Sequence, residues 1–114
     1  MPGVQTIFPV MIDHVNNGKL SLNQLINLMC ENQCKIFGIK NKGFIKEGFD
    51  ADLTIVDMSK KVTIKNEMIA SKCGWTPFHN YKVKGFPVGT IVNGILVMSE
   101  GTILVKSKGQ PLKF

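Results

Sequence analysis

The sequence contains no arginine, since all 14 of its basic residues are lysine, and eight acidic residues leave a net charge of +6. Arginine is the side chain that usually binds phosphate or base edges through two parallel hydrogen bonds. The lysines are scattered along the chain and do not form one stripe with interleaved aromatic residues. We therefore expect no nucleic-acid partner, and we keep a nucleic-acid-binding β module only as a third hypothesis.

Residues that could bind a metal are also scarce. There are three cysteines, Cys30, Cys34 and Cys73, without a C-x-x-C pair, and two histidines, His14 and His79, without an H-x-H pair. An odd cysteine count with this spacing argues against a disulfide framework or a zinc ribbon. Cys30 and Cys34 lie one helical turn apart and could supply two metal ligands, but we interpret them as small apolar side chains on a buried face.

Long hydrophobic runs are absent as well. No run approaches the roughly 18 to 20 residues that a membrane-spanning helix requires. Residues 1–6 (MPGVQT) lack the basic and apolar regions of a signal peptide. The expectation is a cytoplasmic protein with no membrane partner. The 114 residues, 44% of them hydrophobic, suit one globular domain and are too few for a (β/α)8 barrel of roughly 200 residues or more.

Two helices are expected in the first third of the chain. Residues 6–17 carry apolar side chains on one helical face, with Pro9 in the tolerated first turn and Gly18 as the left-handed stop. A second helix opens at Ser21 in a capping-box pattern and runs to Gly38. Its apolar stripe predicts one face that packs against other residues.

After Gly38 the pattern changes to short runs typical of strands. Asn93-Gly94 separates two of them and predicts a type I′ hairpin, because both central residues must adopt positive φ. Residues 66–72 predict a helical turn capped by Asn66, and residues 106–110 (KSKGQ) predict a mobile tail. The expected strands lie at residues 44–45, 53–56, 62–64, 81–83, 90–92, 95–98 and 102–105.

The most informative segment is residues 42–57, KGFIKEGFDADLTIVD. It resembles the segment with which amidohydrolases of the dihydroorotase, hydantoinase and allantoinase group pass from their barrel into a small β domain. Residues 1–6, 20–38, 74–78 (GWTPF) and 85–94 (GFPVGTIVNG) are similar to further motifs of that group, in the same order. Among its branches dihydroorotase matches best and allantoinase next.

Two departures from the family pattern accompany this resemblance. Asn32-Gln33-Cys34 stands where the family has Asn-Pro-Ala, and His79-Asn80 stands where a glycine is expected after WTPF. We expect the first to alter a helix junction and the second to alter a surface turn, with no effect on chemistry.

The resemblance implies an α+β chain. Residues 1–38 would be two helices from the end of a TIM-like amidohydrolase barrel, and residues 39–114 a small partial β-sandwich domain. In the family, one or two metal ions, usually zinc, are bound by an H-x-H pair, a carboxylated lysine, two further histidines and an aspartate. The metal activates water toward a cyclic amide. No such ligand can be carried over to this sequence, so we expect no catalytic residue, no metal site and no cofactor in this chain.

The remaining candidate residues are weak. Pro2 and Gly3 would lie near substrate, through their backbone, because the family's loop at this point borders the pocket. Asp13 and His14 are expected on a solvated helix surface, and His79 in an exposed turn.

Two further pairs of residues have structural rather than chemical interpretations. Asp50 and Asp52 resemble paired carboxylates, but we expect them to cap turns and to pair with backbone. Trp75 and Phe78 are expected to pack rather than to form a ligand cage.

The leading hypothesis is therefore the C-terminal part of a dihydroorotase-like cyclic amidohydrolase that is inactive alone. Its partner would be the missing barrel portion or a separate chain that supplies it, and sheet edges and one apolar helix face should then be exposed. An allantoinase or hydantoinase segment, a non-catalytic subunit that docks on a separate barrel chain, and a homo-oligomer stay open.

Overall fold

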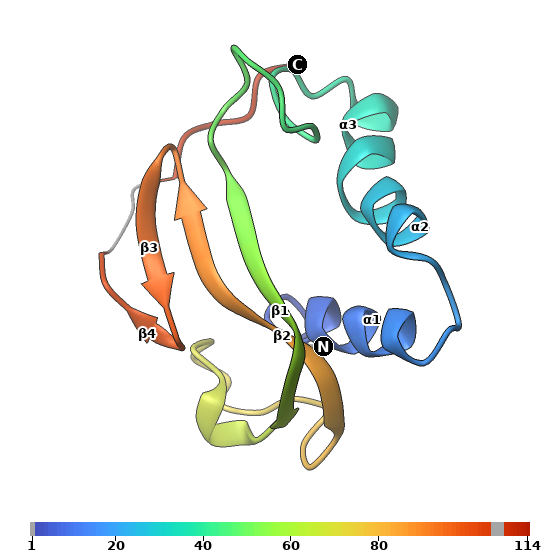
Figure 1. Cartoon of the computed structure of the whole chain (residues 1–114). Helices are drawn as coiled ribbons and strands as arrows, with labels where there is room; N and C mark the ends of the chain where they lie inside the picture. Colours follow the sequence, from blue (N-terminus) through green and yellow to red (C-terminus); the bar gives the residue numbers. More distant parts are fainter. Residues whose placement is uncertain (1, 106–108) are drawn as a thin grey trace. The chain divides into compact units, whose positions relative to one another are not determined.

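The computed structural model describes residues 2–105 and 109–114 (Figure 1). The expected tail at residues 106–110 therefore lies largely outside the described residues. Along the chain the elements are α1 (Ile7–Asn16), α2 (Leu22–Ile26), the π-helical turn η1 (Asn27–Glu31), α3 (Asn32–Phe37), β1 (Leu53–Thr63), the 3-10 turn η2 (Asn66–Met68), β2 (Lys82–Val92), β3 (Ile95–Ser99) and β4 (Thr102–Ile103).

The chain divides into two compact units. Unit 1 consists of the residues up to Ser21 together with Asp57–Phe86, and unit 2 of Leu22–Val56 together with the residues from Pro87 onward. Strands β1 and β2 contribute residues to both units.

Helix α1 of unit 1 confirms the first expected helix. The Gly3 carbonyl accepts hydrogen bonds from the N–H groups of Thr6 and Ile7, at 3.1 and 2.9 Å, and so starts the first turn. At the other end, Gly18 adopts a φ of +71° and its N–H donates to the Val15 carbonyl at 3.0 Å. The glycine thus supplies the left-handed stop that the sequence predicts.

The second expected helix is present but is not a regular α-helix. Its middle turn, η1, is π-helical, and α3 starts at Asn32, where the sequence departs from the family's Asn-Pro-Ala. The left-handed Gly38, with φ +65°, ends it. Of its apolar stripe only Leu25 is buried, at 1% exposure, while Ile36 is 72% exposed. The expected exposure of one apolar helix face is therefore confirmed.

The strands are longer and fewer than expected. Residues 53–56 and 62–64 fall largely within one strand, β1, and residues 81–83 and 90–92 largely within β2. The expected strand at residues 44–45 was wrong, because these residues lie in a bend. The described strands form one sheet in the order β1-β2-β3-β4.

The hairpin between β2 and β3 confirms the turn prediction. Asn93 and Gly94 both have positive φ, +49° and +78°. The two strands are antiparallel and pair Val92 with Ile95, and the register shifts by a bulge between Thr90 and Ile91. Strand β4 pairs antiparallel with β3 in turn.

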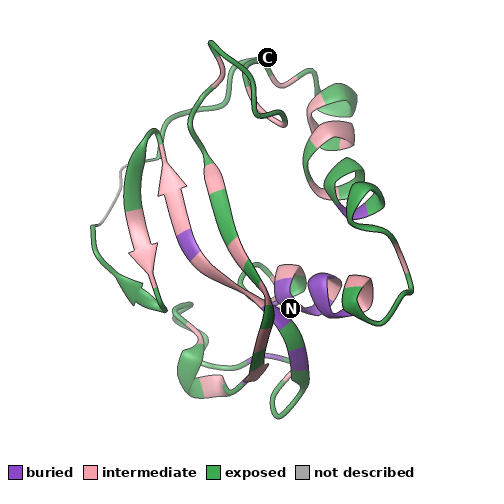
Figure 2. Ribbon diagram, in the orientation of Figure 1, coloured by how far each residue is buried: buried purple, intermediate pink, exposed green. Residues whose placement is uncertain are grey.

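The hydrophobic core of unit 1 lies between α1 and the two long strands. Val10, Ile64 and Val83 are buried together, and Val62, Phe78 and Phe86 pack against them. Figure 2 shows buried positions along α1 and in the neighbouring part of β2. Ile12 is 1% exposed and contacts the strand at Gly85, where a side chain would collide with its Cγ2 atom.

The α+β class is confirmed by these helices and this antiparallel sheet. The second sheet that a sandwich needs is not among the strands described, so the partial β-sandwich stays a prediction. No helix in the described part of the chain is long and apolar enough to cross a membrane.

Candidate functional site

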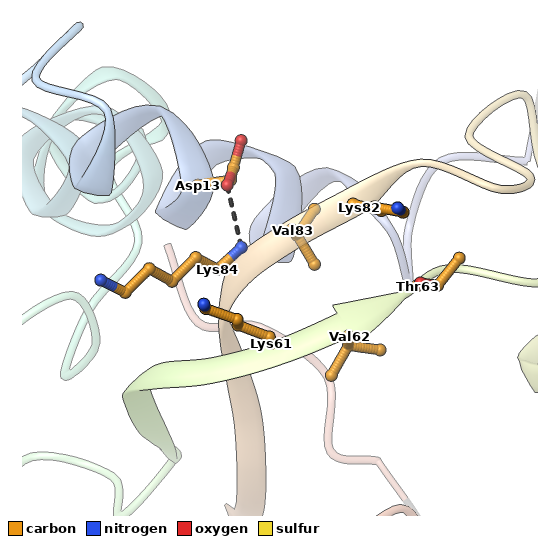
Figure 3. Close-up of a pocket in the computed structure, with 7 residues that line it drawn as sticks. All are labelled: Asp13, Lys61, Val62, Thr63, Lys82, Val83 and Lys84. Atoms are coloured by element: carbon orange, nitrogen blue, oxygen red, sulfur yellow. Dashed lines mark hydrogen bonds between the residues drawn. The ribbon is translucent and has the colours of Figure 1, made fainter.

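Asp13 was expected on a solvated helix face, and this prediction was wrong. Its exposed fraction is 7%, and both carboxylate oxygens accept hydrogen bonds, of which Figure 3 shows the one from Lys84. Oδ1 accepts from the Lys84 N–H at 2.8 Å, and Oδ2 accepts from the side-chain amide of Asn17 at 2.9 Å. Helical periodicity could not reveal this, because the donor on β2 lies 71 residues away along the chain.

Asn16, three residues on from Asp13, also binds the strands. Its Nδ2 atom donates to the Lys84 carbonyl at 2.6 Å and to the Met58 carbonyl at 3.0 Å. Asp13 and Asn16 together therefore satisfy both backbone groups of Lys84 from the side chains of a helix. Such contacts satisfy strand groups that would otherwise lack a partner, so this cluster is structural.

A pocket of about 260 Å³ lies beside this cluster in unit 1. It is lined by Asp13 and by residues 61–63 and 82–84 (Figure 3). Three of these residues are lysines, Lys61, Lys82 and Lys84. Among the described residues that line the pocket there is no histidine or cysteine, and Thr63 carries the one hydroxyl. The Asp13 carboxylate already accepts two structural hydrogen bonds. The pocket offers no acid-base pair.

The two histidines lie in different settings. His14 is half-buried on α1, and its Nδ1 atom is enclosed without a hydrogen-bond partner among the described residues. His79 is exposed in a turn, as expected, and its Nδ1 accepts the Asn66 N–H at 3.0 Å. Asn80 beside it has φ +65°, so the substitution for the family's glycine lies in a surface turn, as expected.

The side chain of Asn66 has a different role from the one predicted. Asn66 was expected to cap a helical turn, but its side chain makes no cap and the 3-10 turn begins after Lys65. Its Oδ1 atom instead accepts the N–H of Thr76 at 3.0 Å. The prediction failed because a side-chain acceptor pairs with whichever backbone donor the tertiary fold brings near.

Pro2 and Gly3, the predicted substrate-adjacent loop, are half-buried at the start of α1. Gln5, close to this loop in the sequence, was not predicted to be a functional residue, although its side chain joins distant segments. Its Nε2 atom donates to the Met68 carbonyl at 2.7 Å, and its Oε1 atom accepts the Ala70 N–H at 2.9 Å. No local pattern marks such a contact. The loop is fixed to the segment after η2 by these two bonds.

In unit 2, the acidic segment behaves as predicted and has an additional partner. Asp52 Oδ1 accepts the Asn93 N–H at 2.8 Å, which ties it to the β2–β3 turn. Lys42 forms ion pairs with Asp50, at 3.0 Å, and with Asp52. The Lys42 ammonium and the Asn93 N–H lower the pKa of the Asp52 carboxyl below its usual value. Asp52 therefore stabilises a turn by binding its backbone, and Asp50 forms an ion pair with Lys42.

The interpretation of the cysteines as buried side chains was wrong. Cys30 is exposed and Cys34 is only half-buried. Phe78 packs against the unit 1 core and stacks edge-to-face on Tyr81 at 6.1 Å. Trp75 is 48% exposed, so its predicted packing role is not confirmed.

Zinc, which the family resemblance implies, requires three or more nitrogen, sulfur or oxygen side-chain ligands. No group of three or more His, Cys, Asp or Glu side chains that could bind a metal occurs among the residues the structure describes. The side chains in the described part of the chain therefore do not fit such a centre.

The comparisons with known proteins agree with the motifs. Residues 4–97 match the amidohydrolase family. The dihydroorotase of Pyrococcus furiosus is 44% identical over 110 residues, which are 96% of this chain and 26% of that enzyme. The L-hydantoinase of Paenarthrobacter aurescens is 39% identical over 106 residues, 91% of this chain and 23% of that protein.

The fold has solved counterparts as well. The structure of L-hydantoinase (dihydropyrimidinase) from Arthrobacter aurescens superposes with a TM-score of 0.87 at 39% identity, over 91% of this chain and 24% of that one. The chain thus spans about a quarter of the length of the relatives it matches. With the family profile covering most of its residues, the chain belongs to the amidohydrolase family.

Proposed function

We propose that this chain is the C-terminal part of a dihydroorotase-like cyclic amidohydrolase. The parent reaction is the reversible hydrolysis of dihydroorotate to N-carbamoyl-aspartate, in pyrimidine biosynthesis in the cytoplasm. The observation that carries the proposal is the 44% identity to a dihydroorotase over 96% of this chain. In the complete enzyme, residues 1–38 would belong to the end of the barrel and residues 39–114 to the small, partly sandwiched β domain.

The residues present indicate which parts of the active site this chain would supply and which the barrel portion would supply. The zinc-binding centre would come from the barrel portion, because the described part of this chain offers no cluster of three ligands. This chain would supply the loop at Pro2 and Gly3, which borders the substrate through its backbone. Gln5 supports that role, since its two hydrogen bonds hold the loop in place.

A chimera tests the proposal directly. The matching residues of the Pyrococcus furiosus dihydroorotase are replaced by this chain, and hydrolysis of dihydroorotate is measured with zinc supplied. We expect metal-dependent turnover by the chimera and none by the isolated chain above a no-protein control. Matched controls are the unmodified enzyme and a chimera with Gly85→Val, which should not fold.

Three results would contradict the proposal. Metal-dependent turnover by the isolated chain would show that it contains its own active site. A folded chimera that binds zinc but hydrolyses no cyclic amide would show that the segment does not belong to this enzyme class. A chimera that prefers hydantoin or allantoin to dihydroorotate would favour the alternative, a hydantoinase or allantoinase segment. The similarity to an L-hydantoinase supports this alternative.

A second candidate function is a non-catalytic subunit that docks on a separate chain carrying the barrel. The apolar side chains exposed on the second helical segment favour it, among them Leu28 at 51%, Ile36 at 72% and Phe37 at 59% exposure. Co-expression with a separate barrel chain and size-exclusion chromatography test this idea. Co-elution that is lost in an Ile36→Asp, Phe37→Asp variant supports docking, and separate elution of both folded chains contradicts it.

The proposal also includes the absence of a nucleic-acid partner. A mobility-shift assay at low salt, where lysine contacts to phosphate are strongest, should show no retardation of DNA or RNA. Salt-sensitive retardation would favour the nucleic-acid-binding module instead.

A further inference from the structure

The second helical segment carries two thiols one turn apart. Cys30 lies in η1 and Cys34 in α3, and the chain stays helical between them, with φ and ψ of −65° and −50° at Glu31 and −66° and −34° at Asn32. Residues four apart on a helix have Cβ atoms about 5–6 Å apart on one face. The π-helical turn therefore does not separate the two thiols.

Cys30 is exposed and Cys34 is half-buried, with the loop at Gly43 packed against the Cys34 side chain. Cys34 lines an open pocket of about 370 Å³ that also includes Lys42 and the rings of Phe44 and Phe49. A Cβ atom on Gly43 would lie 2.7 Å from the Cys34 Sγ atom and 3.1 Å from the Cys30 carbonyl oxygen. The absence of a side chain at Gly43 lets this loop pack directly on the Cys34 thiol and on the backbone of Cys30.

The spacing of the two thiols argues against a disulfide. A disulfide needs Cβ atoms about 3.5–4.5 Å apart, less than the spacing along one helix face. This spacing instead allows the two thiols to bind one ion between them.

We propose that Cys30 and Cys34 form a two-thiolate site for a soft, two-coordinate cation of the Cu(I) class. Binding replaces both thiol protons: two Cys–SH and Cu⁺ give the anionic bis-thiolate Cu(S–Cys)₂⁻ and two H⁺, with no change of oxidation state. Soft thiolate ligands select Cu(I). Zinc needs a four-ligand tetrahedral set, and the described residues near the pair offer no third or fourth ligand. This site is independent of the proposed enzyme function.

Competition against a chromophoric Cu(I) chelator, with the full chain reduced and free of oxygen, tests the site. We expect one tightly bound Cu(I) per chain. Cys30→Ser and Cys34→Ser should each weaken binding about 10²- to 10⁴-fold, because the remaining single thiol loses the effective concentration of its neighbour. Cys73→Ser, which removes the third cysteine, is the matched control and should bind unchanged.

A second reagent keeps the test independent of folding defects and of copper chemistry. Phenylarsine oxide condenses with two thiols and releases one water. Mass spectrometry should therefore detect one phenylarsenic group per chain. Glutathione, a single thiol, should not remove this group, whereas a small dithiol should. If circular dichroism shows that Cys34→Ser unfolds, the test rests on Cys30→Ser alone, because Cys30 is exposed and its replacement should leave the fold intact. Unchanged binding of either probe by folded Cys30→Ser, or equal loss in Cys73→Ser, would overturn the proposal.

Discussion

The two units of this chain are stabilised in different ways. Unit 1 contains Val10, Ile12, Ile64 and Val83 as buried apolar side chains, and its buried Asp13 has both oxygens paired. Unit 2 has only Leu25 as a buried apolar side chain among its described residues. It is organised instead by turns, ion pairs and strand pairing, and it leaves many large apolar side chains exposed. Burial is the larger stabilising term, so the same kind of substitution should cost more in unit 1.

The largest effect is expected at Gly85, in unit 1. Its φ is +98°, and a Cβ atom there would overlap the Cγ2 atom of Ile12. Gly85→Ala combines a strained backbone with overpacking of a buried contact, so we expect a loss of about 3 kcal/mol or more in the free energy of unfolding. Urea denaturation followed by circular dichroism measures it.

The control for Gly85 lies in unit 2. Gly101 has a similar φ of +80°, but a Cβ atom there would meet nothing within 4 Å. Gly101→Ala should therefore cost only the backbone term, about 1–2 kcal/mol. If both substitutions cost the same, the close packing of α1 on β2 is not a source of stability.

The second prediction compares two isoleucines. Ile64 is 2% exposed in the unit 1 core, and Ile36 is 72% exposed in unit 2. Ile64→Ala should lower the free energy of unfolding by about 2–4 kcal/mol, because it leaves a cavity. Ile36→Ala should change it by no more than about 0.5 kcal/mol. A comparable cost at both sites would show that the Ile36 surface is covered in solution, for example by a second copy of the chain.

The third prediction concerns two aspartates. Asp13→Ala leaves the partly buried Lys84 N–H without its acceptor, which should cost about 1–3 kcal/mol. Asp50→Ala removes only a partly exposed ion pair with Lys42 and should cost less than about 1 kcal/mol. Thermal denaturation at neutral pH compares them, and an equal cost would contradict the structural role of Asp13.

The smallest effect is a pH dependence in unit 2. The folded pKa of Asp52 lies below its unfolded value of about 3.9. Its ion pair therefore contributes stability above pH about 4, and this contribution is lost as the pH falls through the lowered folded pKa. Because the pair is partly solvated, the change should not exceed about 1 kcal/mol.

Lys42→Met checks the origin of this effect. It removes the cation that lowers the pKa of Asp52, so the variant should lose less stability than the parent chain between pH 5 and pH 3, measured by urea denaturation at each pH. An identical acid dependence in both chains would mean that Lys42 is not the partner that matters.

Local patterns predicted part of this molecule well. The helix before Gly18, the Asn93-Gly94 hairpin and the left-handed stop at Gly38 follow from periodicity and from residues that tolerate positive φ. Residues 53–64 and 81–92 were each read as two short strands, because glycine and proline at 85–89 and charged residues at 57–61 interrupt the β pattern. Pairing across the sheet outweighs these local interruptions.

Local sequence patterns also predicted only part of the candidate site. The sequence correctly assigned Asp52 to the stabilisation of a turn, since the acids lie within a short turn-forming segment. It misplaced Asp13, Cys30 and Cys34, because burial depends on which segments meet in space. A buried carboxylate is recognised only once its backbone donor is known, and a helix face is recognised as uncovered only once its neighbours are known.

The sequence by itself determined the family, the α+β class and the turns, because motif order, hydrophobic period and glycine placement are local properties. Only the tertiary structure decided that α1 binds the strand backbone through Asp13 and Asn16, and that Cys30 is exposed and Cys34 half-buried. Burial and long-range hydrogen bonds depend on which distant segments meet in space, and local periodicity carries no information about that.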